Sequence, residues 1–385
     1  MTPEIHRAGW IMADPRTWIE NGAVGLIGGR VAFLKKASPH MRAVDHGPGV
    51  ILPALCNAHT HLSLSFLKGA VETENGFVPW VERLISCRES LGPETAAGAA
   101  LAAAARMKAA GVGAAAEVGP ADPGGSAMRR AGIEGLVFLE SLGAETFPPV
   151  LPPDEKGLRF SWAGHGPHTT APAALQALKA AARRTGRPFT LHLAESREET
   201  AFLATGTGPW ADLMARRGHE VSQWRPWGER PVERALRLGL LDPGTLAVHL
   251  LEVTAGDIDI LARTGTGVCL CPRSNLALHR KLPDIARFIA AGLRPALGTD
   301  SLAGTESLSL FDELRFVSDR YPALGPGTLL SLATINGARV LGLPEQGMIR
   351  PGHRVRMIYT ALRAPNQRKA AEILVSGPHP EVVWL

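Results

Sequence analysis

Two of the thirteen histidines, His59 and His61, are only two residues apart and directly follow the apolar run VILPALCNA. On extended backbone, side chains at positions i and i+2 point the same way, so both imidazoles can bind one metal ion. A His-x-His triplet also occurs simply as a pair of polar turn residues after a strand. Its position at the end of an apolar run favours a metal site here.

Four further groups that could bind metal or transfer protons end later apolar runs: His192 and Glu195 in LHLAE, His249 in AVHLL and Asp300 in LGTDS. Each has an ordinary structural alternative. A strand histidine is more often a buried core residue, Asp300 stands where a turn would cap the next helix, and Glu195 where an acid would favour a helix N-terminus. We favour one shared site because these groups recur at matched strand ends, which converge at one mouth in a parallel barrel.

The donor set His59, His61, His192 and Asp300 suits a borderline divalent cation with one position left open for water. Zinc is the first expectation because it lowers the pKa of bound water to about 7, and ferrous iron or manganese fits the same ligand types. The usual two-metal site of such barrels has a bridging lysine on the fourth strand, but the run LRFSWAG (158–164) contains none. We therefore predict one metal ion.

The elements that must position these groups alternate regularly from about residue 50 to 340. Helical patterns such as 172–184, 232–238 and 282–291 separate short apolar runs. The runs are VILPAL (50–55), GVGAAAEV (111–118), GLVFLES (135–141), LRFSWAG (158–164), FTLHLAE (189–195), TLAVHL (245–250), GVCLCP (267–272) and LRPALGTD (293–300). Eight strand–helix units predict an α/β fold, a (β/α)8 TIM-like barrel.

The two ends of the chain follow another pattern. Gly28-Gly29 separates two short strand-like runs near the N-terminus, and VRMIY (355–359) and the final EVVWL are strand-like near the C-terminus. We predict a discontinuous small β-sandwich domain from residues 1–49 and 345–385, beside a hydrolase barrel over 50–344. Residues 205–229 are a Trp-, Pro- and Gly-rich insertion, either a substrate lid or a packed surface loop.

Composition excludes several other classes. The 385 residues are 45% hydrophobic and 20% charged, typical of a folded soluble domain. The net charge of +5 comes from basic residues spread along the chain, so we expect no nucleic-acid partner. No secretory signal or membrane span is expected, and four cysteines without a disulfide pattern favour the cytoplasm. A small-molecule substrate is the expected partner, and a homo-oligomer is left open.

Several motifs occur together and in order: NAHTHL (57–62), LHLAES (191–196), CPRSNLAL (271–278) and LGTDS (297–301). Over nearly its whole length the chain resembles the amidohydrolase superfamily. The HxAE motif, the SN pair and PHT (167–169) are most similar to its mononuclear deaminase and chlorohydrolase branch. One departure is Arg354, where members usually have an acidic residue.

This resemblance implies roles for individual residues. Glu195 would protonate the ring nitrogen and shuttle protons, His249 would hydrogen-bond the attacking hydroxide, and Asp300 would take its proton while also holding the metal. His168 in GPHTT resembles a substrate-contacting histidine of this branch. Its alternative is a helix-start residue, and the nearby His165 is easily confused with it.

The substrate is a narrower question. HLAESREETAFLATGTGP and the Trp-rich insertion resemble the part of this branch that acts on 6-aminodeoxyfutalosine, a nucleoside of menaquinone biosynthesis that carries a benzoate. Arg83 and Arg88 in FVPWVERLISCRES, on a predicted helix, are candidates for binding that carboxylate, or are simply solvated. Alternatives are S-adenosylhomocysteine or methylthioadenosine, guanine and cytosine deamination and triazine chlorohydrolysis.

Two other classes of protein fit these residues less well than a deaminase does. A barrel that binds a ligand without turnover has no need of Glu195. A hydrolase of cyclic amides would be expected to have the missing strand-four lysine.

Overall fold

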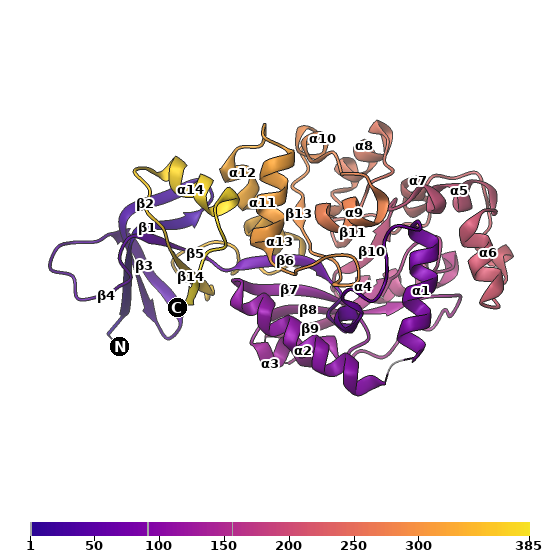
Figure 1. Ribbon diagram of the computed structural model, residues 1–385, viewed down its shortest axis with the longest axis horizontal. Coiled ribbons are helices and arrows are strands. Elements are labelled where there is room, and N and C mark those ends of the chain that lie inside the picture. Colours follow the sequence, from indigo (N-terminus) through magenta and orange to yellow (C-terminus); the bar gives the residue numbers. More distant parts are fainter. Residues whose placement is uncertain (1, 91, 156) are drawn as a thin grey trace.

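Eight parallel strands form the larger of two sheets in the computed structural model, which describes residues 2–90, 92–155 and 157–385 (Figure 1). Each strand pairs with the next one along the chain. In order they are β6 (Leu55–Thr60), β7 (Val112–Gly119), β8 (Glu134–Ser141), β9 (Leu158–Gly164), β10 (Phe189–Leu193), β11 (Thr245–His249), β12 (Gly267–Leu270) and β13 (Ala296–Leu297). Consecutive parallel pairing of this kind requires a crossover outside the sheet after every strand.

The first and last strands of this sheet are joined just beyond β13. Thr60 pairs with Asp300 in a parallel bridge, and the amides of Thr299 and Asp300 donate to the carbonyl of His59 at 3.0 and 3.1 Å. Gly298 permits this approach, because a Cβ there would lie 2.8 Å from the Cβ of His59. The sheet therefore closes on itself, and the predicted (β/α)8 barrel is confirmed.

Helices cover the outside of the barrel, which is why its strands are buried on both faces. The predicted helix over residues 172–184 is α4, which begins with proline, as a first helical turn allows. The outer helices are α2 (Pro93–Ala109), α3 (Gly124–Ala131), α4 (Pro172–Arg184), α7 (Pro231–Arg237), α8 (Ala255–Thr264), α10 (Ile285–Ala290), α11 (Leu310–Arg320), α12 (Pro326–Ala333) and α13 (Ile335–Val340).

Six further elements follow the carboxyl ends of barrel strands. They are η1 (Leu62–Leu67), α1 (Phe77–Ser90), α5 (Arg197–Thr205), α6 (Pro209–Arg216), η2 (Val221–Trp224) and α9 (Pro272–His279). Apolar side chains of all six belong to one cluster, in which Trp210 and Trp224 of the insertion 205–229 are buried. The insertion is thus packed by its tryptophans, and part of it also lines the cavity described below.

The second sheet joins both ends of the chain, as predicted. Its strands are β1 (Glu4–Asp14), β2 (Thr17–Ile27), β3 (Arg30–Lys36), β4 (Val44–Asp45), β5 (Gly49–Pro53), β14 (Met357–Ala361) and β15 (Val382–Trp384). They form one connected seven-stranded sheet in the order β15-β14-β5-β1-β2-β3, with β4 beside β1. Figure 1 shows this sheet at one end of the molecule with both termini, while α14 (Gln367–Ser376) packs on α11 and α12.

The apolar run predicted as the first barrel strand, 50–55, is divided between the two sheets. Residues of β5 pair with β1 and β14, and the barrel strand β6 begins only at Leu55. The prediction of one strand here was wrong. An apolar run looks the same in either sheet, so the sequence does not show where the chain passes from one sheet to the other. The division into two domains at residue 49 stays a prediction, and β5 belongs with the strands of the chain ends.

Candidate active site

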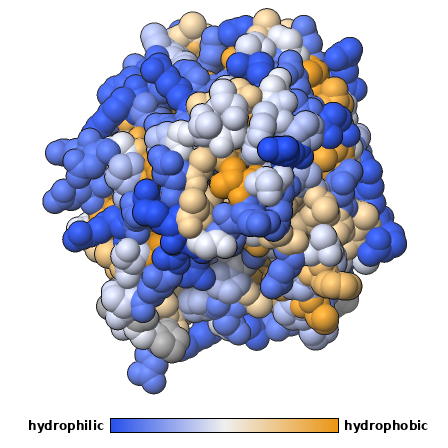
Figure 2. Space-filling view, turned by 90° about the vertical axis from the view of Figure 1, so that its right-hand side faces the viewer, coloured by the Kyte–Doolittle hydropathy of each residue, from blue (hydrophilic) through white to orange (hydrophobic). Residues whose placement is uncertain are grey.

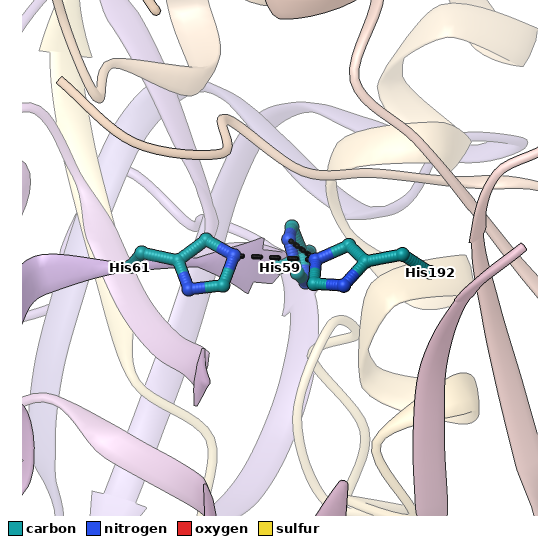
Figure 3. A group of neighbouring side chains, drawn as sticks. All are labelled: His59, His61 and His192. Atoms are coloured by element: carbon teal, nitrogen blue, oxygen red, sulfur yellow. Dashed lines mark hydrogen bonds between the residues drawn. The ribbon is translucent and has the colours of Figure 1, made fainter. Parts of the chain in front are cut away.

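Three imidazoles converge inside the mouth of the barrel (Figure 3). His59 lies in β6, His61 directly follows it, and His192 lies in β10, and all three are buried. The Nε2 atom of His192 lies 3.3 Å from Nε2 of His59 and 3.3 Å from Nε2 of His61. The three ligand atoms thus face one small volume, as the sequence predicted.

The hydrogen bonds of these rings show that the group fits a metal ion. Nδ1 of His61 donates to the carbonyl of Val118, and Nδ1 of His192 donates to the carbonyl of His165, each at 2.8 Å. The Nε2 atoms then carry lone pairs, which repel one another unless a cation lies between them. Tetrahedral zinc with Zn–N bonds of about 2.0–2.1 Å places its nitrogens about 3.3–3.4 Å apart, close to the observed separations.

Asp300, just beyond β13, lies beside these imidazoles across the seam of the barrel, where the first and last strands meet. Its Oδ1 lies 3.8 Å from Nε2 of His59 and 3.7 Å from Nε2 of His61, and its Oδ2 accepts a hydrogen bond from the hydroxyl of Ser274. Burial and the neighbouring imidazoles hold the pKa of His59 well below its ordinary value, so this ring is neutral and able to bind metal at pH 7.

Glu195 and His249 lie next to the imidazole group. Nε2 of His249 is 3.6 Å from Oε1 of Glu195, and the side-chain amide of Asn275 donates to Nδ1 of His249 at 2.9 Å. Burial lowers the pKa of His249 to about 4, so the ring is neutral and carries its proton on Nε2. Burial opposes ionisation of Glu195, yet His249 and the His279 imidazole beside it hold the pKa of that carboxyl well below its usual range.

The backbone that carries these groups is fixed by a buried acid in the first turn of α5. Glu199 accepts from the amides of Ala194 and Glu195 at 3.1 and 2.7 Å, and its own amide donates to the N-cap side chain of Ser196. Glu195 is therefore held by its local turn and faces the cavity.

A cavity of about 540 Å³ opens from the imidazole group toward α1 and α6. In the space-filling view of this end of the molecule, apolar side chains lie at the bottom of a recess whose rim is formed by hydrophilic, intermediate and weakly hydrophobic residues (Figure 2). Its inner wall includes His61, His192, Glu195, His249 and Asp300, and its outer wall includes Trp80, Leu84, Ile85, Arg88, Glu89, Leu213, Met214 and Arg217. The predicted catalytic groups thus share one cavity with an apolar outer chamber.

The residues predicted to contact substrate divide into two groups. Arg88 lines the cavity, whereas Arg83, on the same helix, is not among the lining residues. His165 lines it too, whereas His168 lies behind, buried against the ring of Trp210 with its Nδ1 3.7 Å from Glu199. The structure therefore brings Arg88 to the site and leaves Arg83 and His168 out of the cavity wall.

Two groups at the site were not predicted from the sequence, the carboxyl group of Glu140 and the imidazole of His279. Glu140, the next-to-last residue of β8, lines the cavity, and burial raises its pKa. One of its buried oxygens has no hydrogen-bond partner in the part of the chain that the structure describes. His279, the last residue of α9, contacts Glu195. The position of Glu140 at a strand end was a usable signal, whereas nothing in the sequence pairs His279 with Glu195.

Comparison with known proteins agrees with this geometry. The amidohydrolase family profile matches residues 50–380, and the chain belongs to this family. It is 32% identical to the aminodeoxyfutalosine deaminase of Deinococcus radiodurans, over 83% of this chain and 81% of that one. It is 28% identical to a 5-methylthioadenosine/S-adenosylhomocysteine deaminase of Nitratidesulfovibrio vulgaris, over 92% of this chain and 81% of that one.

Among solved structures, an adenosine deaminase of Xanthomonas campestris with bound zinc superposes with a TM-score of 0.81. It shares 23% sequence identity, with 99% of this chain and 90% of that one covered. This likeness shows the same fold. Family membership and the deaminase relatives confirm the predicted class, a metal-dependent hydrolase that acts on C–N bonds as a deaminase. Within the described residues, no helix is both long and apolar enough to cross a membrane.

Proposed function

We propose that the chain hydrolyses the ring amine of a 5′-substituted adenine nucleoside, with 6-aminodeoxyfutalosine as the first candidate substrate. The observation that carries this proposal is the shape of the cavity. It runs from the imidazole group to an apolar chamber with Arg88 in its wall. The net reaction is a ring C–NH₂ and water giving a ring carbonyl and ammonia.

We assign the metal site to His59, His61, His192 and Asp300, and propose one ion, zinc before ferrous iron or manganese. When bound, such an ion makes hydroxide available at neutral pH by lowering the pKa of water. The tautomers of His61 and His192 support this assignment, because both rings present a free Nε2.

The protein groups around the ion divide the proton transfers between them. The ionised Glu195 takes a proton from the attacking water and passes it to the ring nitrogen next to the carbon under attack. The Nε2–H of His249 donates to the attacking oxygen, because its Nδ1 is occupied by Asn275. Asp300, oriented by Ser274, then takes the remaining proton of the added hydroxyl and passes it to the amine, which leaves as ammonia, so that both carboxylates end as they began.

The outer chamber suits an aromatic 5′ substituent that carries a carboxylate. Trp80, Leu84 and Met214 offer apolar contact, and the guanidinium of Arg88 offers a cation. Arg217 already forms an ion pair with Glu89, so Arg88 is the first choice. A benzoate-bearing nucleoside has both features, which would place the reaction in menaquinone biosynthesis.

Methylthioadenosine or S-adenosylhomocysteine is the second candidate. The same apolar chamber accepts a thioether, and a relative that matches 92% of the chain is named for these substrates. The two candidates differ in whether the chamber must also bind an aryl carboxylate.

The test measures ammonia release by the metal-loaded protein from 6-aminodeoxyfutalosine, its analogue without the carboxylate, methylthioadenosine and S-adenosylhomocysteine. We expect the highest kcat/KM for the carboxylated nucleoside. Arg88→Ala should lower that preference about tenfold to a hundredfold, the scale of a lost charge-assisted hydrogen bond. Arg83→Ala, on the same helix but outside the cavity wall, should leave it unchanged. Equal kcat/KM for the carboxylated compound and its analogue would refute carboxylate recognition, and a preference for the thioethers would establish the second candidate.

A further inference from the structure

The proton-shuttling carboxylate has an imidazole neighbour that the reaction scheme does not use. Nε2 of His279 lies 3.1 Å from Oε1 of Glu195, closer than the Nε2 of His249 to the same oxygen at 3.6 Å. The His279 side chain is only 7% exposed, and Glu195 is buried too. An ionised carboxylate can only accept hydrogen bonds, so His279 is the donor.

The position of His279 is itself fixed by packing. It ends α9, seven residues after the proline that begins this helix, and its ring lies against Phe77 with centroids 4.4 Å apart. Phe77 is the first residue of α1 and lines the cavity. His279 therefore links Glu195 to the helix that borders the substrate, although it is absent from the cavity wall itself.

We propose that His279 is a positioning residue for the proposed deamination, holding Oε1 of Glu195 by an Nε2–H hydrogen bond so that Oε2 carries the transferred proton. Oε1 faces two imidazole nitrogens, His249 and His279, and both would have to move for it to take up a proton. Oε2 is then the oxygen that can exchange a proton with the substrate. This inference rests on the proposed function, because it assigns Glu195 the proton transfer.

The consequence is a specific effect on catalysis. Without the His279 donor, the Glu195 side chain can rotate, and its two oxygens become equivalent. The substrate is bound by other residues, so kcat should fall while KM changes little. Metal binding should not change either, because His279 makes no hydrogen bond or ion pair with the imidazole group.

The test compares three substitutions at one position in the metal-loaded enzyme: His279→Leu, His279→Gln and His279→Asn. A glutamine amide can place its N–H where Nε2 lies, whereas an asparagine is one methylene too short. We expect His279→Leu and His279→Asn to lower kcat about tenfold to a hundredfold, with KM within about threefold of wild type. His279→Gln should recover most of the loss. Arg280→Gln, at the exposed next residue, is the control for disturbing this helix end and should leave kcat unchanged.

Two results would overturn the inference. Equal kcat values for the glutamine and asparagine variants would show that the hydrogen bond has no role, and this comparison holds even if the leucine variant fails to fold. Wild-type kcat in all three would show the same. A Glu195→Gln enzyme measured in parallel separates the two hypotheses. If it stays active, the proton-transfer role that the proposed function assigns to Glu195 fails. If it is inactive while the His279 variants are normal, only this inference fails.

Discussion

Replacing Glu195 by glutamine tests the chemistry of the site most directly. Glutamine has the same shape and keeps an oxygen that can accept from Nε2 of His279, 3.1 Å away. It also keeps the backbone amide that donates to Glu199. The substitution therefore removes the negative charge and the ability to take up and pass on a proton, while leaving the packing of this turn in place.

The expected loss of activity is large because no other group at the site can take over the proton transfer. Two imidazoles lie next to Glu195. His279 is the nearer one but is not part of the cavity wall, and His249, which is, has a pKa of about 4 and its proton on Nε2, so it is a poor base at pH 7. A lost general acid–base typically costs a factor of about 10² to 10⁴ in rate. At about 1.36 kcal/mol per factor of ten, this is an increase of about 2.7–5.4 kcal/mol in the activation barrier.

The assay is steady-state ammonia release at pH 7 with metal content measured on the same sample. Glu195→Gln should retain wild-type metal content and lose at least about a hundredfold in kcat. Glu198→Gln, a charge change in the first turn of the same helix α5, is the matched control and should behave as wild type. A metal-replete Glu195→Gln enzyme with a tenth or more of the wild-type kcat would show that another group transfers the proton.

Three further predictions concern the metal, a tautomer and a buried charge. The active protein should contain about one zinc per chain, lost in His59→Ala and His192→Ala while circular dichroism shows a folded barrel; two tightly bound ions would contradict a mononuclear site. Asn275→Asp replaces the donor to Nδ1 of His249 by an acceptor, which favours the tautomer with its proton on Nδ1 and none on Nε2. This variant should retain the metal and lose about a hundredfold in kcat, and an unchanged kcat would contradict the assigned tautomer. Among the described residues the buried ammonium of Lys108 has no hydrogen-bond partner, and burial lowers its pKa to about 7. The folded state then binds fewer protons than the unfolded state between about pH 7 and 10. Lys108→Met should therefore raise Tm most at pH 7 and below, and progressively less up to pH 10. A gain in Tm that does not depend on pH would contradict this.

The barrel was predictable because its signal is periodic and local. Each strand is a short apolar run, and the helix over 172–184 was found with its bounds because proline begins it and buried residues recur along one face. The convergence of His59, His192 and Asp300 was also predictable, since it requires only that parallel strands share one mouth.

Contacts that depend on how distant segments pack could not be predicted in this way. His279 and Glu195 are 84 residues apart, and their contact depends on where α9 ends relative to the turn after β10. His165 and His168 are three residues apart in a loop, and no periodicity tells which of them faces the cavity. Likewise, the run 50–55 is apolar throughout, so only tertiary pairing shows that the chain passes from one sheet to the other near Ala54.

The closure of the barrel and the assembly of the proposed metal site depend on the same few atoms. The carbonyl of His59 accepts the amide of Asp300, while the side chains of these two residues lie 3.8 Å apart inside the mouth. Asp300 has a φ of +58° and His249 a φ of +75°, in the left-handed region that is unfavourable for residues with a Cβ. Such strain costs about 1–3 kcal/mol per residue and persists only where the surrounding structure imposes it. Here the seam hydrogen bonds impose it at Asp300. The first and last strands therefore have to meet before the carboxylate can face the imidazoles, which makes the complete ligand set a property of the closed barrel and not of either strand alone.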